Sequence, residues 1–76
     1  MNTPTAAGLT AEVRAEMARQ GISAAKVATA TNINPATLSR RLNGTSDFTV
    51  GEVSRVAQFL GVTLADLLRR AETIAA

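Results

Sequence analysis

Helix-stop residues divide this chain into short segments, and this division limits the fold more than any other feature of the sequence. A glycine or an asparagine follows each of the first four segments, where it can adopt the left-handed backbone that ends many helices. A residue that caps helix N-termini opens each segment. The predicted helices are 11–20 after Thr10, 24–31 after Ser23, 35–42 after Asn34, 50–60 after Thr49, and one from 64 onward after Thr63. No strand pattern is present, so the sequence predicts an all-α fold of five helices.

Local spacing supports several of these boundaries. Thr49 and Glu52 have the spacing of a capping box, in which side chain and backbone bond reciprocally. Pro35 directly after Asn34 suits the first position of a helix. Asn32 stands at the corner between the second and third segments, and asparagine is one of the few residues that tolerate a left-handed conformation there. These signals favour sharp turns between short helices.

The core of this fold has to be built from aliphatic side chains. The chain has 76 residues, of which 46% are hydrophobic, but only two phenylalanines and no tryptophan or tyrosine. This length is close to the smallest that holds a fold around one core, so we expect one domain. We expect a flexible tail over 1–9, the folded domain over 10–70, and a helix end or frayed tail over 71–76.

Residue types that are missing exclude most catalytic schemes. The chain has no cysteine and no histidine, which removes disulfides, thiolate metal ligands and the commonest general base. We therefore expect no enzyme activity, no catalytic residues, no metal and no cofactor. The N-terminus does not resemble a signal peptide, and no apolar run approaches membrane-spanning length, so we expect a cytoplasmic protein without a membrane partner.

The distribution of charge says more than its total, because the net charge is only +2. Between Met17 and Ser46 there are four basic residues and no acid. The acids flank this window at Glu12, Glu16, Asp47, Glu52, Asp66 and Glu72. A basic middle rich in arginine favours a nucleic-acid partner, since arginine makes forked contacts to phosphate and guanine. The alternative is a solvated charged surface.

The stretch 22–44 combines two short helices with a tight corner. Its second helix has an outer face that carries Thr37, Ser39, Arg40 and, just after its end, Asn43. Such a pair is a usual device for presenting a helix to the DNA major groove, which admits a helix and displays a distinct pattern for each base pair.

A family template follows the same residues. The segments ISAAKVA (22–28), NI (32–33), TLSR (37–40) and LNG (42–44), with FLGVTLADLL (59–68) as a closing segment, resemble the phage-repressor and Cro-like (Xre-type) helix-turn-helix family over roughly residues 10–68. The resemblance implies a compact five-helix lambda-repressor-like domain. It also implies that Ala28, Ile33 and Leu38 are buried where the two helices cross, and that the second helix of the pair reads bases.

The outer face and the resemblance together predict the contacts with DNA. The expected base-contacting residues are Pro35, Ala36, Thr37, Ser39 and Arg40, with Arg40 foremost because arginine to guanine is the commonest specific pairing. The residues expected to contact phosphates and set the register are Ser23, Lys26, Asn34, Asn43, Thr45 and Ser46. The alternative interpretation is that Arg40 and the hydroxyl residues are ordinary solvated side chains.

Some positions depart from the family pattern. Members usually have a glutamine near the start of the first motif helix, where it helps to fix the DNA backbone, whereas this chain has Ala24. Pro35 and Ala36 stand where many members place polar base-reading side chains, so readout should shift to the polar residues that follow, to thymine methyl groups or to DNA shape.

Three further positions bear on how the third helix is held. Arg41 occupies a position that is often apolar in the family, so we expect it to lie over the edge of the core and to pair with an acid. Met17 and Leu42 correspond in some members to an arginine and an acid that pair between the first and third helices. Both positions are apolar here. Replacing only one partner of a buried ion pair would leave the other charge unpaired, so the joint change indicates contact, and we expect the two side chains to pack against each other.

Two functions stay open at this point. The resemblance implies a transcriptional regulator that binds a double-stranded DNA operator, either a phage-type repressor or a Cro-like protein, in the cytoplasm and associated with the nucleoid. The alternative is a helical protein-interaction module, such as an antitoxin, antirepressor or adaptor, that does not read DNA. No small-molecule ligand is expected.

The last helix raises the question of self-association. It carries the apolar residues Leu64, Leu67, Leu68, Ala71 and Ile74. This surface either mediates a weak homodimer or packs on the first and fourth helices.

Overall fold

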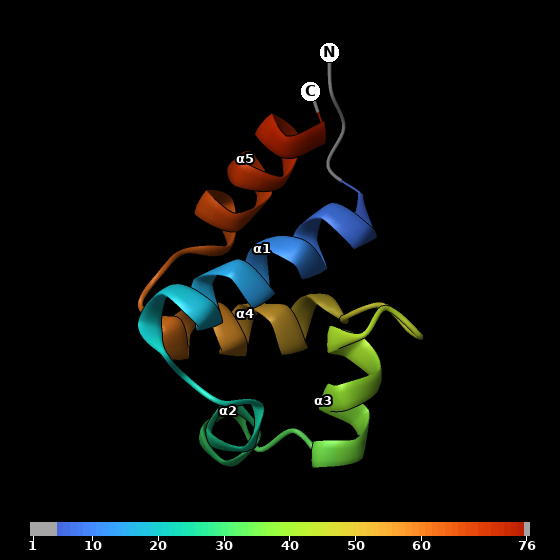
Figure 1. Ribbon diagram of the computed structural model, residues 1–76, viewed down its shortest axis with the longest axis vertical. Coiled ribbons are helices and arrows are strands. Elements are labelled where there is room, and N and C mark those ends of the chain that lie inside the picture. The colour runs from blue at the N-terminus through green and yellow to red at the C-terminus, as the bar shows by residue number, and fades with distance from the viewer. Residues whose placement is uncertain (1–4, 76) are drawn as a thin grey trace.

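The computed structural model describes residues 5–75, with side chains through residue 72, and all regular structure in this part is helical (Figure 1). The helices are α1 (Ala6–Gln20), α2 (Ala24–Thr31), α3 (Pro35–Leu42), α4 (Val50–Leu60) and α5 (Leu64–Ala75). The all-α prediction with five helices is therefore confirmed. The side chain of Ile74 lies outside the described part.

The helix ends follow the local signals in most cases. Gly21 and Gly61 adopt left-handed conformations after α1 and α4, and Asn32 does so after α2 with φ 59°. Thr49 and Glu52 form the predicted capping box of α4. Local hydrogen bonding therefore sets these boundaries, which is why the sequence predicted them.

The start of α1 differs from the prediction, because Thr5 and not Thr10 is its N-cap. Thr5 accepts a hydrogen bond from the backbone N–H of Gly8 at 2.9 Å, while Thr10 is buried inside the helix. Residues 6–9, expected in a flexible tail, form the first turn of α1. This turn packs on α5: a methyl group at Gly8 would lie 3.6 Å from the Cβ of Ala71. Packing between helices distant in sequence thus extends α1.

Every helix contributes one large, fully buried side chain to a single core. These are Val13, Val27, Leu38, Val56 and Leu67. In Figure 1 α5 and α1 lie at the upper end, α2 and α3 lie at the lower end, and α4 runs between them. Consistent with this arrangement, α4 contacts α1, α2 and α5. The core therefore joins the buried side of the α2–α3 pair to the rest of the molecule.

The apolar face of α5 is largely used within the chain. Leu67 and Ala71 are completely buried, and Leu64 is partly buried against the core. Leu68 remains 37% exposed. Packing on the neighbouring helices accounts for most of this face, and self-association through α5 stays a prediction.

A polar junction joins the C-terminal half of α1 to α5 and to the end of α4. Glu16 accepts hydrogen bonds from Gln20 at 2.8 Å, Arg19 at 2.9 Å and Arg70 at 2.6 Å. The Gln20 amide also donates to the carbonyl oxygen of Leu60 at the end of α4. These three donors, Gln20 foremost, lower the pKa of Glu16 from 4.5 to about 2. The carboxylate is therefore charged in the folded protein near neutral pH and links α1 to α5, while the Gln20 amide extends the network to α4.

Candidate nucleic-acid interface

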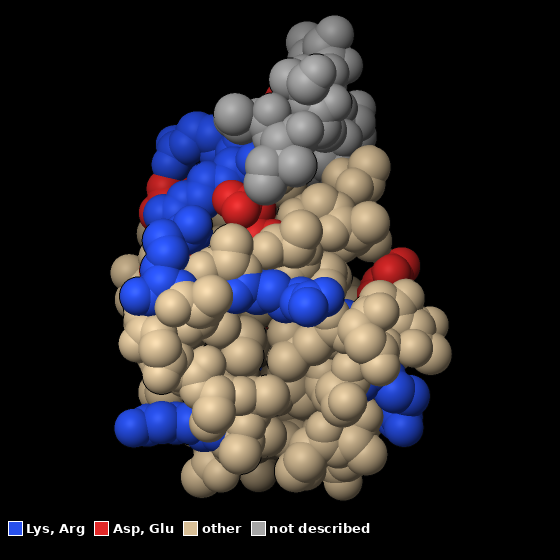
Figure 2. Space-filling view, viewed as in Figure 1, with Lys and Arg blue, Asp and Glu red and all other residues tan. Residues whose placement is uncertain are grey.

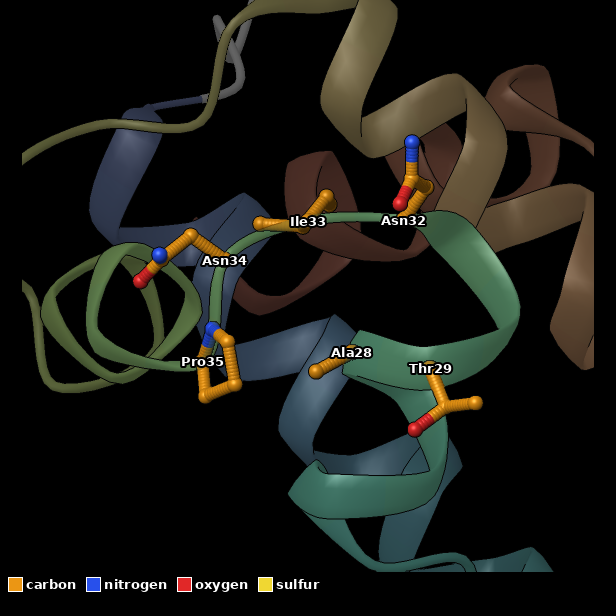
Figure 3. Close-up of a pocket in the computed structure, with 6 residues that line it drawn as sticks. All are labelled: Ala28, Thr29, Asn32, Ile33, Asn34 and Pro35. Atoms are coloured by element: carbon orange, nitrogen blue, oxygen red, sulfur yellow. The ribbon is translucent and has the colours of Figure 1, made fainter.

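The corner between α2 and α3 is held by its buried side. Ala28, Ile33 and Leu38 are 4%, 5% and 1% exposed, which confirms their expected burial. The backbone N–H of Ile33 donates to the carbonyl oxygen of Ala28 at 3.2 Å and closes the corner. Figure 3 shows the shallow hollow at this corner, with lining residues from the end of α2, the corner itself and the start of α3. The two helices therefore meet as a rigid pair.

The side-chain oxygen of Asn34 sets the start of α3. It accepts from the backbone N–H of Ala36 at 2.9 Å and from that of Thr37 at 3.4 Å, and Pro35 occupies the first helical turn. In the same way, the hydroxyl of Ser23 accepts from the backbone N–H of Lys26 at 3.2 Å and caps α2. Two of the expected phosphate contacts therefore also have a structural task.

The expected base-contacting residues share the outer surface of α3. Four of them are exposed and Thr37 is partly buried; the exposed ones are Pro35, Ala36, Ser39 and Arg40. The Arg40 guanidinium donates to the Thr37 hydroxyl one turn earlier at 3.4 Å. Leu38 lies on the opposite, buried side. Helix geometry thus collects the expected set on one accessible face.

The segment after α3 uses much of its hydrogen-bonding capacity internally. The side-chain oxygen of Asn43 accepts from both the backbone N–H and the hydroxyl of Thr45, at 2.9 Å and 2.6 Å. The hydroxyl of Ser46 accepts from Arg41 at 2.6 Å and is partly buried. Asn43 and Thr45 are exposed at the end of α3, whereas Ser46 belongs to the junction with α4.

That junction is built around Arg41, as predicted. Arg41 donates to Glu52 from Nε at 2.9 Å and from Nη2 at 3.3 Å, across the boundary between α3 and α4. Donation of these hydrogen bonds to Glu52 raises the pKa of Arg41. The Arg41 hydrogen bond and then the Thr49 backbone N–H lower the pKa of Glu52 from 4.5 to about 2. The pair therefore stays charged and fixes the C-terminal end of α3.

Pairing divides the basic residues into two groups. Arg19, Arg41, Arg69 and Arg70 are bound by carboxylates. Among the described residues, four have no acidic partner: Arg14, Lys26, Arg40 and Arg55. In Figure 2 the lower part, formed by α2 and α3, is mostly uncharged, with basic side chains at its two sides and across the face above it, while the acidic side chains lie higher. Three of the four, Arg14, Lys26 and Arg40, therefore place unpaired positive charge on or beside the α2–α3 pair.

Arg14 is a candidate that the sequence prediction missed. It lies on α1, is exposed, and lines a surface hollow together with Ala24, Ser39, Leu42 and Asn43. It falls just before the acid-free window that began at Met17, and Glu12 and Glu16 flank it in the sequence. Only the packing of α1 against α3 brings Arg14 beside the expected contacts.

The fold and this surface define a small helical protein that presents one helix of a fixed pair outward. A family model described as helix-turn-helix matches residues 13–67, which is more than half of the chain. The chain therefore belongs to the Cro/C1-type helix-turn-helix family, a family of DNA-binding domains. This confirms the resemblance inferred from the sequence.

No curated protein and no solved structure matches the chain. Within the described part, no helix combines the length and the apolar character needed to cross a bilayer.

Proposed function

We propose that this protein is a sequence-specific transcriptional regulator that inserts α3 into the major groove of duplex DNA, and that it represses by occupying an operator as phage-type and Cro-like repressors do. The observation that carries the proposal is the outer face of α3. Its expected contact residues are exposed there except for Thr37, and Arg40 among them lacks an acidic partner in the described part. Such a protein acts where the chromosome lies, in the cytoplasm and on the nucleoid.

The dimensions suit this insertion. The major groove is about 12 Å wide, and an α-helix with its side chains is about 10–12 Å across. Pro35 and Ala36 offer apolar contact to thymine methyl groups at the start of α3. Arg40, in the last turn, can pair with the O6 and N7 atoms of guanine. Thr37 and Ser39 add hydroxyl groups between them.

Backbone contacts would then set the register. Lys26 supplies an unpaired cation on α2, and Ser23 lies at the N-terminus of the same helix, where backbone N–H groups favour anions. Asn43 and Thr45 flank the other end of α3. Asn34 and Ser46 can add only the donors that their internal hydrogen bonds leave unused.

Selection of bound sequences from a random duplex pool tests the proposal directly. An enriched motif supports sequence-specific binding, and a palindrome indicates that two copies bind together, as weak pairing through α5 would allow. A pool without enrichment, together with binding that does not depend on salt, contradicts DNA recognition. That result would favour a protein-interaction module, because counterion release makes DNA binding steeply salt-dependent.

Two substitutions separate base contacts from phosphate contacts on the selected duplex. Arg40→Ala should weaken binding by about 1–3 kcal/mol and relax the preference at one base pair, whereas Lys26→Ala should weaken selected and random duplexes alike. Arg55→Ala is the matched control, because Arg55 is an exposed arginine on α4 that also lacks an acidic partner in the described part. Equal losses on all duplexes for Arg40→Ala would contradict its role in reading a base.

A further inference from the structure

Arg14 stands where α1 meets the end of α3. Two neighbouring surface hollows share Arg14, Leu42 and Asn43 in their linings. One hollow extends to Ala24 at the start of α2 and to Ser39 on α3. The other runs along the N-terminal half of α1 to Gly44. Arg14 is therefore central to a groove that continues onto the outer face of α3.

The polar groups of the hollow beside α3 suit an anion. Arg14 has no hydrogen bond or ion pair with any described residue, so its guanidinium N–H groups are unused. The oxygen of Asn43 accepts from Thr45, so the amide group of the same side chain has its N–H donors left. Ser39 adds a hydroxyl, and no carboxylate lines either hollow. The set offers one positive charge and neutral donors.

The anion that fits this set is a backbone phosphate and not a free one. The side chains of Ala24 and Leu42 are apolar, so Arg14 would be the single positive charge available to hold a free phosphate in this open hollow. A duplex whose major groove receives α3 brings its phosphates to the flanks of that helix. The arginine fork matches a phosphate oxygen pair, and the rest of the duplex supplies the remaining binding.

We propose that Arg14 binds one backbone phosphate of the duplex beside Ser39 and Asn43, so that α1 forms part of the DNA interface. This inference rests on the proposed function. It makes Arg14 a contact that positions α3 in the groove and carries no base preference of its own.

The salt dependence of binding tests the contact on the duplex selected from the random pool. Each neutralised phosphate contributes about 0.9 to the slope of log affinity against log salt. Arg14→Ala should therefore make this slope less steep by about 0.9. The affinities for the selected and the random duplexes should fall equally. Arg14→Lys should keep the slope, because it keeps the charge. Arg55→Ala is the control, since its hollow contains no residue of α3. Unchanged thermal unfolding confirms that each variant is folded.

Single neutral methylphosphonates in the duplex locate the contact. One position should weaken binding of the wild-type protein and leave binding of Arg14→Ala unchanged. If the wild-type protein binds DNA but Arg14→Ala keeps the full slope, the contact is refuted and the proposed function stands. If the wild-type protein binds no duplex, both fail together. The Arg14 Nε–Hε resonance can also be followed in two titrations. If millimolar inorganic phosphate shifts it saturably and duplex DNA does not shift it, the hollow binds a small anion and the inference is overturned.

Discussion

The ion pair between Arg41 and Glu52 offers the sharpest test of how α3 is held. Glu52 performs two tasks, because it accepts from Arg41 at 2.9 Å and also closes the capping box with Thr49 at 2.9 Å. Glu52→Gln keeps a capping-box residue and removes the charge. Arg41→Leu places an apolar side chain at the edge of the core. The two variants and their combination form a double-mutant cycle.

The burial of the pair sets the magnitude. The side chains are 19% and 14% exposed, so the pair is neither fully solvated nor fully buried. Exposed pairs contribute about 0.2–1 kcal/mol, while breaking a buried pair costs about 3–5 kcal/mol. We expect each single variant to lose about 1–3 kcal/mol of unfolding free energy, and the coupling to be about 1–2 kcal/mol. The lowered pKa of Glu52 also indicates that folding stabilises its charged form. The Thr49 backbone N–H contributes to this lowering, so Arg41 accounts for only part of it.

Urea unfolding at neutral pH measures the cycle. Arg55→Leu makes the same change at an exposed position without an acidic partner in the described part and should cost under about 0.5 kcal/mol. The double variant should be less destabilised than the sum of the single ones. Additive losses, within about 0.3 kcal/mol, would refute the argument and reduce the pair to a solvated surface contact.

Three further predictions concern other parts of the fold. Asn32→Val should cost about 1–2 kcal/mol in urea unfolding because φ is 59° there, whereas Asn32→Gly should be close to neutral. The pKa of Glu16 falls from 4.5 to about 2 on folding, so its stabilisation is complete above pH 4.5 and is lost as the pH falls toward 2; Glu16→Gln should be less stable at pH 7 and lose less in acid. Leu42→Ala should cost about 2 kcal/mol, since Leu42 is only partly buried, and a double-mutant cycle with Met17→Ala should show non-additivity if the two side chains touch.

The sequence predicted the features that depend on neighbouring residues. Asn34 caps α3 through N–H groups two and three residues later, and Thr49 caps α4 through one three residues later. Asn32 turns the corner because its own backbone can adopt a left-handed conformation. Such interactions are encoded within one turn, so spacing alone reveals them.

The features that the sequence missed depend on residues that folding brings together. Thr5 replaces Thr10 as the cap of α1 because α5 offers Ala71 as a packing surface for the first turn. Glu16 meets Arg70 across 54 positions, and no local pattern marks that pair. Arg14 joins the candidate interface only through the packing of α1 on α3.

The same packing explains why a net charge of +2 understates the suitability of this chain for DNA. Carboxylates engage the arginines at the two helix junctions, where Glu16 and Glu52 have side chains only 10% and 14% exposed. At these junctions the charges of the arginines are largely balanced by the carboxylates. Arg14, Lys26 and Arg40, in contrast, lie exposed around the α2–α3 pair. Salt screens exposed charges more than partly buried pairs. Moderate salt should therefore weaken the proposed binding to duplex DNA well before it weakens the fold, because the charges of the proposed interface are not the ones that join the helices.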